Sequence, residues 1–279
     1  MSTTENILKN LGGSAANSLI NIFEYPEFLQ DEEPQILDSS PYVSDEMLID
    51  IISHKQEVFK CLSLNIQSIN AKFDELRTYI QYLSESQSSF DAILLQETWL
   101  KDSQDTDYFN LTNYSLISKS ARCSSHGGLA IYLRSDLKYN IINSEFEDSN
   151  IWESLFINVI LPNNKFLTLG NVYRPPRDHI QNYNQFQEEF IGTIKSFKGN
   201  VVIGGDFNID LLKIKERYIF NEYFELIISS GYIPKIIYPT RLTRNNGTLI
   251  DNFLCKLSHQ FSKTTSGIMT HKLSDHQPY

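Results

Sequence analysis

The sequence of 279 residues lacks several features that mark particular classes of protein. Its three cysteines, Cys61, Cys123 and Cys255, are too few and too far apart for a disulfide framework or a cysteine-based metal site. No apolar run approaches the roughly 18 residues that a membrane-spanning helix needs. The N-terminus has no basic patch followed by an apolar stretch, as a secretory signal would have. We therefore expect a protein of a reducing, intracellular compartment with no membrane partner.

Basic charge is also scarce, because 34 acidic residues outnumber 24 basic ones and give a net charge of −10. A charge of this sign counts against a partner made of phosphates. The acidity is concentrated in residues 1–57, which contain eleven acidic and two basic residues. Residues 58–279 contain 23 acidic and 22 basic residues. The second region is therefore nearly neutral, so its charge does not exclude weak, salt-sensitive binding of a partner made of phosphates.

The two regions also differ in pattern. Residues 1–57 are rich in acidic, Ser, Asn and Pro residues and lack sustained periodicity, which predicts a mostly disordered leader with a short helix near 45–54. Residues 58–279 alternate apolar runs with amphipathic stretches and are predicted to form one domain.

Within that domain, apolar residues at Phe73, Leu76, Ile80 and Leu83 have the spacing of one helix face. Helices are predicted at 71–84, 180–197 and 216–230. Strands are predicted at 59–66, 90–95, 128–133, 152–160, 166–172, 201–204, 249–254 and 264–269. This order favours an α/β fold in which sheets pack face to face with helices outside.

Polar residues stand at the ends of these strands, where a fold can present rigid side chains to a cleft. Each taken alone has a plain structural explanation as a turn, a surface residue or a helix cap. Together they form one constellation, which comprises Asn65, Gln96, Glu97, Tyr173, Arg174, Asp206, Asn208, Asp251, Asp275 and His276.

The donor types in this constellation restrict its chemistry. Carboxylate and amide oxygens without cysteine suit Mg²⁺ or Mn²⁺ rather than Zn²⁺. A divalent ion, a carboxylate that orients water and a histidine beside the scissile group are what phosphodiester hydrolysis requires. A Ser/His/Asp hydrolase would use similar residues, but the sequence has no GxSxG motif. A P-loop and a dinucleotide fingerprint are also absent.

The ordered motifs LNIQS, LLQETWL, VYRPP, GGDFN, LIDNFL and SDHQP resemble those of the exonuclease–endonuclease–phosphatase superfamily. The segments HGGLAIYLR, VYRPP and PTR are particularly similar to the endonuclease domain of LINE-type (non-LTR) retrotransposons. The resemblance covers residues 59–279. It implies a four-layered α/β sandwich, with two packed mixed β-sheets flanked by helices.

The resemblance also implies roles for individual residues. Glu97 matches the glutamate that binds the catalytic Mg²⁺, and Asn65 matches the asparagine that supports the metal and the phosphate. Asp206 matches the aspartate that orients or deprotonates the attacking water. Tyr173 matches a tyrosine near the scissile phosphate, and Asn208 matches an asparagine that holds the phosphate in the transition state.

The last motifs supply a histidine and its partners. Asp275 and His276 match the pair whose histidine contacts the phosphate, and Asp251 matches the aspartate that fixes the tautomer of this histidine. Three further residues are predicted to contact the DNA backbone: Arg174, Thr240 and Arg241.

Two departures from the family pattern bear on function. Gln67 stands where abasic-site repair nucleases have an aspartate, which favours the nicking branch over repair. The chain ends three residues after His276, so the domain is expected to lack its final strand, and the usual reverse transcriptase does not follow.

The leading prediction is a Mg²⁺-dependent DNA endonuclease that nicks one strand and leaves a 3′-hydroxyl, as in target-primed reverse transcription. Its expected partners are DNA and a reverse transcriptase, and its expected place of action is the nucleus. Two alternatives stay open: an inactive retrotransposon remnant that at most binds DNA or protein, and a small-molecule phosphodiesterase of the same superfamily.

Overall fold

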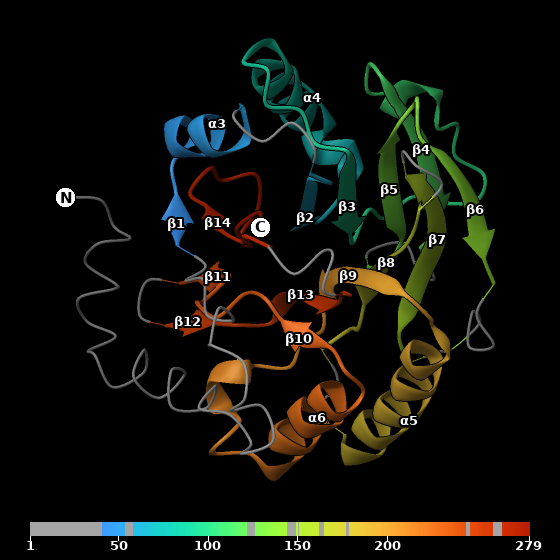
Figure 1. The fold of residues 1–279 in the computed structure, drawn as a ribbon, viewed down its shortest axis with the longest axis vertical. Coiled ribbons are helices and arrows are strands. Elements are labelled where there is room, and N and C mark those ends of the chain that lie inside the picture. The colour runs from blue at the N-terminus through green and yellow to red at the C-terminus, as the bar shows by residue number, and fades with distance from the viewer. Residues whose placement is uncertain are drawn as a thin grey trace.

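The computed structural model describes residues 41–53, 58–121, 126–143, 149, 151–161, 165–176, 179–243, 246–258 and 264–279. Within these ranges no helix has both the length and the apolar character needed to cross a bilayer. Two sheets of several strands dominate the fold, and helices flank them (Figure 1).

The larger sheet has six strands in the order β10-β13-β9-β8-β7-β6 over the described part of the chain. Only β8 and β9 run parallel to each other in this sheet, so it is mixed. Its strands are β6 Lys138–Ile142, β7 Glu153–Leu161, β8 Lys165–Tyr173, β9 Asn200–Asp206, β10 Ile233–Pro234 and β13 Asp251–Lys256.

The smaller sheet has four strands in the order β2-β3-β5-β4. Here β2 and β3 run parallel, and the other neighbours run antiparallel. Its strands are β2 Cys61–Asn65, β3 Ala92–Gln96, β4 Tyr114–Lys119 and β5 Leu129–Arg134.

Side-chain alternation along β3 shows how the layers stack. Ala92 and Leu94 belong to the core shared with the six-stranded sheet. Ile93 and Leu95 belong to a second core shared with helix α4 (Ile69–Glu85). Because both faces of β3 are covered, its sequence is a continuous apolar run instead of an alternating one.

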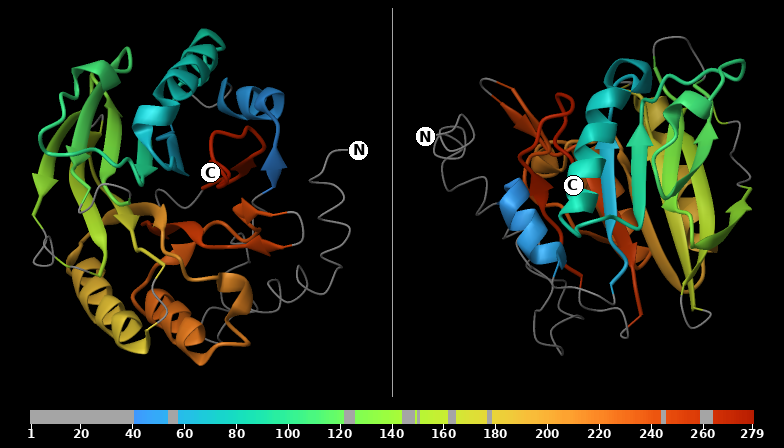
Figure 2. Two further views of the ribbon diagram at one scale, coloured as in Figure 1. Left: turned by 180° about the vertical axis from the view of Figure 1, so that it is seen from behind. Right: turned by 90° about the horizontal axis from the view of Figure 1, so that it is seen from above.

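Helices cover the outer faces of both sheets. Helices α5 (Ile180–Ser196) and α6 (Tyr218–Ser229) pack on the six-stranded sheet, opposite to α4 (Figures 1 and 2). Helix, sheet, sheet and helix thus form four layers, which confirms the predicted fold class. The predicted helices and most predicted strands lie within a few residues of their expected bounds. Strands β4, β6 and β10 were not predicted, and neither were the two-residue strands at 42–43, 241–242 and 247–248.

Part of the predicted leader belongs to the folded structure. Residues 42–43 form β1 (Tyr42–Val43), and Asp45–Ser53 form α3, close to the helix expected at 45–54. Strand β1 pairs in parallel with β14 (Ile268–Met269). Val43, Leu48 and Ile52 are buried in the same core as α4. The division into a leader and a domain at residue 57 stays a prediction, while residues 42–53 pack against the domain.

The C-terminal residues lie along the free edge of β2. Tyr279 and Ser63 exchange both backbone hydrogen bonds, at 2.7 and 3.1 Å. The Tyr279 hydroxyl bonds to Ser63 Oγ at 3.0 Å and donates to the carbonyl oxygen of Gly205 at 2.9 Å. In residues 264–279 no strand follows β14. A small hairpin, β11 (Arg241–Leu242) with β12 (Gly247–Thr248), lies beside this segment.

Two glycines at the end of β9 allow close packing around the site. A Cβ atom at Gly204 would lie 2.7 Å from both Leu94 Cδ1 and Phe253 Cε1. A Cβ atom at Gly205 would collide with the backbone carbonyl of Val172 in the neighbouring strand. Side chains at these positions would therefore push β9 away from its neighbours in both sheets.

We therefore expect Gly205→Ala to lower the free energy of unfolding by about 2 kcal/mol or more, because rigid backbone atoms would have to move. Gly267→Ala is the matched control, since the nearest atom to its Cβ would be 3.4 Å away. The control should change the free energy of unfolding by no more than about 0.5 kcal/mol. Urea denaturation measures both, and equal effects of the two substitutions would contradict this account of β9.

Candidate active site

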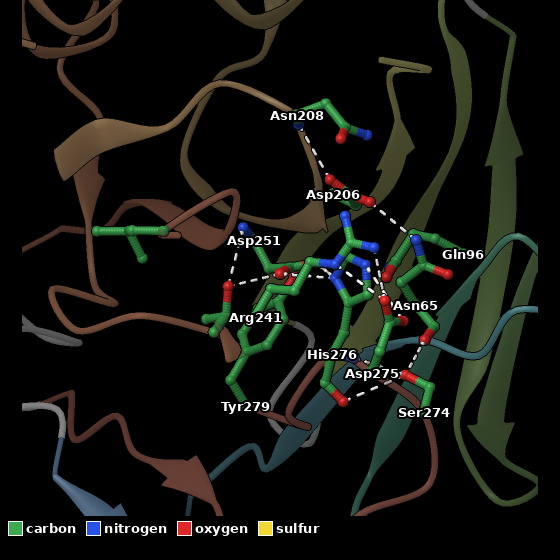
Figure 3. A network of polar contacts seen from close by, with 12 residues as sticks. Asn65, Gln96, Asp206, Asn208, Arg241, Asp251, Ser274, Asp275, His276 and Tyr279 are labelled. Carbon is green, nitrogen blue, oxygen red and sulfur yellow. Dashed lines mark hydrogen bonds and ion pairs between the residues drawn. The ribbon is translucent and has the colours of Figure 1, made fainter. Parts of the chain in front are cut away.

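Strand register brings the predicted residues together at one edge of the two sheets. Asp206 at the end of β9 lies beside Asp251 at the start of β13 and beside Tyr173 at the end of β8. Asn65 ends β2, and its register partner Gln96 ends β3, directly before Glu97. Figure 3 shows the side chains of Asn65 and Gln96 from one sheet and of Asp206 and Asp251 from the other converging at this place.

The side-chain amide of Asn65 links the two sheets. Its Nδ2 donates to Glu97 Oε1 and to Asp206 Oδ2, each at 2.8 Å. Asn65 is fully buried and Asp206 is 1% exposed, whereas Glu97 is half-buried. In this arrangement the amide nitrogen faces both carboxylates, and Asn65 Oδ1 accepts a bond from the Gln67 backbone N–H at 3.3 Å. Asn65 thus holds two carboxylates in place.

Asp251 is the centre of a second group of hydrogen-bonded side chains in the site. Both carboxylate oxygens of Asp251 lie within 3.0 Å of His276 Nδ1, and Thr240 Oγ1 donates to Oδ2 at 2.5 Å. One ligand-type atom from each of Asp206, Asp251 and His276 lies within 4.8 Å of the others. Because Nδ1 of His276 is engaged with Asp251, the ring presents its other nitrogen, Nε2, to the site.

Burial and neighbouring charges shift the pKa values of this cluster. Burial, followed by the carboxylate of Asp251, raises the pKa of Asp206 to about 7, although His276 and Asn65 act in the opposite direction. Burial, the largest single influence, lowers the pKa of His276. The carboxylate of Asp251, with those of Asp206 and Asp275, acts in the opposite direction, and together they raise this pKa to about 9. At neutral pH the histidine is thus a cation, and Asp206 can take up or release a proton.

Backbone strain is concentrated at the same strand ends. Glu97, Asn208 and Gln67 have φ angles of 52°, 48° and 50°. Such left-handed conformations are unfavourable for residues with a side chain and cluster at functional sites in proteins. The Asn208 N–H donates to Asp206 Oδ1 at 3.0 Å, so the turn after β9 also fixes this carboxylate.

Two of the predicted residues, Tyr173 and Thr240, are buried around the site, and Asn208 is half-buried. Tyr173 is 2% exposed, and its pKa is raised by burial and then by the carboxylates of Glu97 and Asp206. Thr240 is fully buried and bonds to Asp251, so it supports that carboxylate. Asn208 Nδ2 donates to the backbone carbonyl of Arg174 at 2.7 Å, which ties the turn to the end of β8.

The structure does not place Arg174 where a DNA contact requires it. Arg174 is 1% exposed, and the central carbon of its guanidinium lies 4.0 Å from the ring centroid of Tyr183. Its Nη1 donates to the carbonyl oxygens of Phe207 and Asn208 at 3.3 and 3.2 Å. The predicted backbone contact is therefore corrected: Arg174 holds the turn after Asp206 from inside the protein. The predicted DNA contact of Thr240 is corrected in the same way, because this side chain is fully buried and cannot reach DNA.

Arg241 and Asp275 lie at the surface beside the buried cluster. Arg241 donates to Asp275 Oδ2 from Nε at 2.9 Å and from Nη2 at 2.6 Å, and both side chains are about 40% exposed. Asp275 Oδ1 lies 3.9 Å from His276 Nε2. Of the three predicted DNA contacts, Arg241 is the one whose guanidinium reaches solvent.

Supporting residues that the sequence did not reveal lie behind the site. Glu153 is 2% exposed and accepts a bond from the Gly128 N–H at 2.6 Å. The carbonyl of Gly128 in turn accepts from the N–H of Thr98, next to Glu97. Gln96 Nε2 donates to Asn171 Oδ1 at 2.6 Å, which adds a second polar link between the sheets. Only the position of Gln96 at a strand end gave a signal in the sequence.

The donor set fits a hard divalent cation. Glu97 offers a half-exposed carboxylate next to buried Asp206, and the described residues around it supply oxygen and nitrogen atoms but no sulfur. Such oxygen donors suit Mg²⁺ or Mn²⁺. Glu97 is the residue best placed to hold the ion at the open side of the site, while Asn65 in its observed orientation presents a donor rather than a ligand oxygen.

Comparison with known proteins agrees with this geometry. Residues 62–276 match the sequence profile of the Endonuclease/Exonuclease/phosphatase family. The chain belongs to this family. Among curated proteins, no sequence matches it significantly.

Several solved structures are similar to it at low sequence identity. The endonuclease domain of TRAS1, a telomere-specific non-LTR retrotransposon, has 17% identity and a TM-score of 0.59, covering 79% of this chain and 95% of that domain. The Neisseria 3′ phosphatase NExo bound to a product DNA hairpin has 16% identity and a TM-score of 0.58, over 79% and 97%. The Leishmania major AP endonuclease LMAP has 13% identity and a TM-score of 0.61, and the match covers 85% of this chain and 94% of that chain. These likenesses show the shared fold.

The shifted pKa values predict how stability depends on pH. The pKa of His276 is about 9 in the folded protein against 6.5 normally, so this stabilisation is complete below pH 6.5 and is lost as the pH rises towards 9. The raised pKa of Asp206 acts in the same sense, as its neutral form is favoured below about pH 7.

We expect the Tm of the protein in EDTA to fall between pH 6.5 and 9, and His276→Asn to reduce this fall. Differential scanning calorimetry measures both. An equal decline in the variant would show that His276 does not contribute in this way.

Proposed function

We propose that the domain is a divalent-metal-dependent DNA endonuclease that hydrolyses a phosphodiester bond in one strand. The observation that carries the proposal is the convergence of Glu97, Asp206 and the His276–Asp251 pair at one edge of the two sheets. This set provides a cation ligand, a proton acceptor and a cationic donor within one site. Family membership and the similar nuclease folds support the choice of phosphodiester chemistry.

In the proposed reaction Asp206 orients the attacking water and accepts its proton. Two donors, Asn65 Nδ2 and the Asn208 N–H, hold this carboxylate in a fixed orientation. A pKa of about 7 matches the protonation step to neutral pH, which favours general-base catalysis. As the water oxygen bonds to phosphorus, the bond from phosphorus to the 3′ oxygen breaks. The leaving 3′ oxygen takes up a proton from solvent and becomes a 3′-hydroxyl, and the phosphate stays on the 5′ oxygen of the next nucleotide.

His276 provides positive charge at the phosphate. Asp251 holds its Nδ1 and keeps the ring protonated, so Nε2–H can donate to a phosphate oxygen. Glu97 would hold the divalent cation, which when bound offsets charge that develops on the phosphate oxygens. Tyr173, Asn208 and Asp275 border this position and are proposed to contact the phosphate or its neighbours.

DNA is the proposed substrate, and Arg241 is the proposed backbone contact. Its guanidinium lies at the surface next to His276, paired with Asp275, and this position would place a strand across the site. The likeness to the TRAS1 endonuclease domain favours a nick whose 3′-hydroxyl primes reverse transcription. A reverse transcriptase partner and action in the nucleus are part of this proposal.

Nicking of supercoiled plasmid in Mg²⁺ tests the function. Glu97→Gln, Asp206→Asn and His276→Gln should each lower the rate at least about 100-fold, because each removes one proton-transfer or charge-stabilising group. Glu85→Gln is the matched control, an exposed carboxylate at the end of α4, and should stay within twofold of the unchanged protein. Nicking that persists in all three site variants would refute the assignment.

Hydrolysis of bis(p-nitrophenyl) phosphate without nicking would assign the site to small phosphodiesters.

Metal binding is tested separately from activity. Millimolar Mg²⁺ should raise the Tm of the unchanged protein, since a ligand that binds only the folded state stabilises it. Glu97→Gln should abolish most of this increase, whereas Glu85→Gln should retain it. An increase of equal size in both variants would show that Glu97 does not hold the ion.

A further inference from the structure

Residues 41–53 lie outside the span that matches the family, yet they contact both segments that carry the buried cluster. We call these residues the N-terminal clasp. One of its partners is the C-terminal segment, residues 264–279, which carries His276. The other is the β11–β12 hairpin with the residues just before it, which carries Thr240 and Arg241 (Figure 1).

The clasp is joined to the C-terminal segment through its backbone. The Ile268 N–H donates to the Pro41 carbonyl at 2.8 Å, and the Thr270 N–H donates to the Val43 carbonyl at 2.9 Å. Both bonds belong to the parallel pairing of β1 with β14. They fix the chain six to eight residues before His276.

The clasp is joined to the hairpin through Tyr42. Its hydroxyl donates to the carbonyl of Pro239 at 2.6 Å, and its ring centroid lies 6.2 Å from that of Tyr238. Pro239 directly precedes Thr240, whose hydroxyl donates to Asp251. The contact therefore lies one residue away from a support of the His276–Asp251 pair.

Asp45 joins the start of α3 to two other elements at once. Its Oδ1 accepts from the Tyr79 hydroxyl on α4 at 2.7 Å, and its Oδ2 lies 3.2 Å from Nδ1 of His271. The His271 ring stacks on Tyr79 with centroids 3.8 Å apart. Lys72, also on α4, donates to the Leu273 carbonyl at 2.6 Å. This cluster holds residues 271–273 against α4, directly before Ser274.

The next contacts lead into the site. Ser274 Oγ donates to the backbone carbonyl of Asn65 at 2.7 Å and accepts from the His276 N–H at 3.0 Å. Asn65 is the residue that bridges Glu97 and Asp206. Figure 3 shows Ser274 beside Asn65 and His276. Asp45 is thus connected, through His271 and then Ser274, to both Asn65 and His276.

We propose that the N-terminal clasp is a positioning element for the reaction, with Asp45 as its central positioning residue. It fixes the segments before His276 and Thr240, so that His276 Nε2 stays directed at the phosphate. The chemistry it serves rests on the function proposed above, whereas its hold on the C-terminal segment does not. Asp45 touches none of the reacting groups, and its effect is transmitted through His271 and Tyr79.

Nicking kinetics of the full chain test the catalytic part of the proposal. Asp45→Ala should lower kcat at least tenfold and leave the KM for plasmid DNA within twofold, because the DNA-facing Arg241 is retained. Asp45→Asn keeps an oxygen that can accept from Tyr79, and it should restore kcat to within about threefold. Glu46→Ala is the matched control, an exposed acidic residue in the same helical turn, and should leave kcat unchanged. Equal kcat values for Asp45→Ala and the unchanged protein would overturn the proposal.

Hydrogen exchange tests the clasp without any nicking activity. In Asp45→Ala the amides of Ile268 and Thr270 should exchange at least tenfold faster, while amides of β8 and β9 keep their protection. Faster exchange throughout the protein would mean that Asp45 only stabilises the fold, and unchanged exchange at Ile268 and Thr270 would mean that it holds nothing in place. Either result overturns the proposal. Failure of the unchanged protein to nick, with the local exchange result intact, would instead count against the proposed function alone.

Discussion

The arrangement of the site depends on one buried amide, that of Asn65, which donates to a carboxylate from each sheet. Glu97 and Asp206 carry like charges and come from different layers, so nothing in their own chemistry would bring them together. Two N–H donors on one nitrogen offset that repulsion and set the distance between the layers at this edge. The glycines of β9 allow the same closeness, since a side chain at Gly204 would meet Leu94 of the opposite sheet.

Charge balance explains why the segment that carries His276 lies against the ends of β9 and β13. Asp206 and Asp251 face each other in the register of β9 and β13 and are almost completely buried. Two buried carboxylates are costly without partners. His276 supplies the missing positive charge, and Tyr279, with its hydroxyl against Gly205, holds the end of the same segment in the core. Folding and the proposed chemistry therefore use the same pair of carboxylates.

Local pattern was enough to predict the strands whose faces are both buried and the polar residues at their ends, such as Glu97 and Asp206. It missed β4 and β6, where buried and exposed residues do not form a clear alternation. It also misplaced Arg174, because the ring of Tyr183 that encloses it comes from a helix later in the chain. The packing of residues 41–53 against the domain was not predicted for a similar reason, since Tyr42 contacts Pro239 across 197 residues and no local pattern shows such a contact.

In the proposed site Glu97, held by Asn65, binds the cation, while Asp206, Asp251 and His276 act on protons and the phosphate. Anomalous scattering from a crystal grown with Mn²⁺ distinguishes these roles directly. We expect a peak within coordination distance of a Glu97 carboxylate oxygen, with His276 Nδ1 still bonded to Asp251. A peak coordinated by Asp206, Asp251 and His276 together, with none at Glu97, would contradict it.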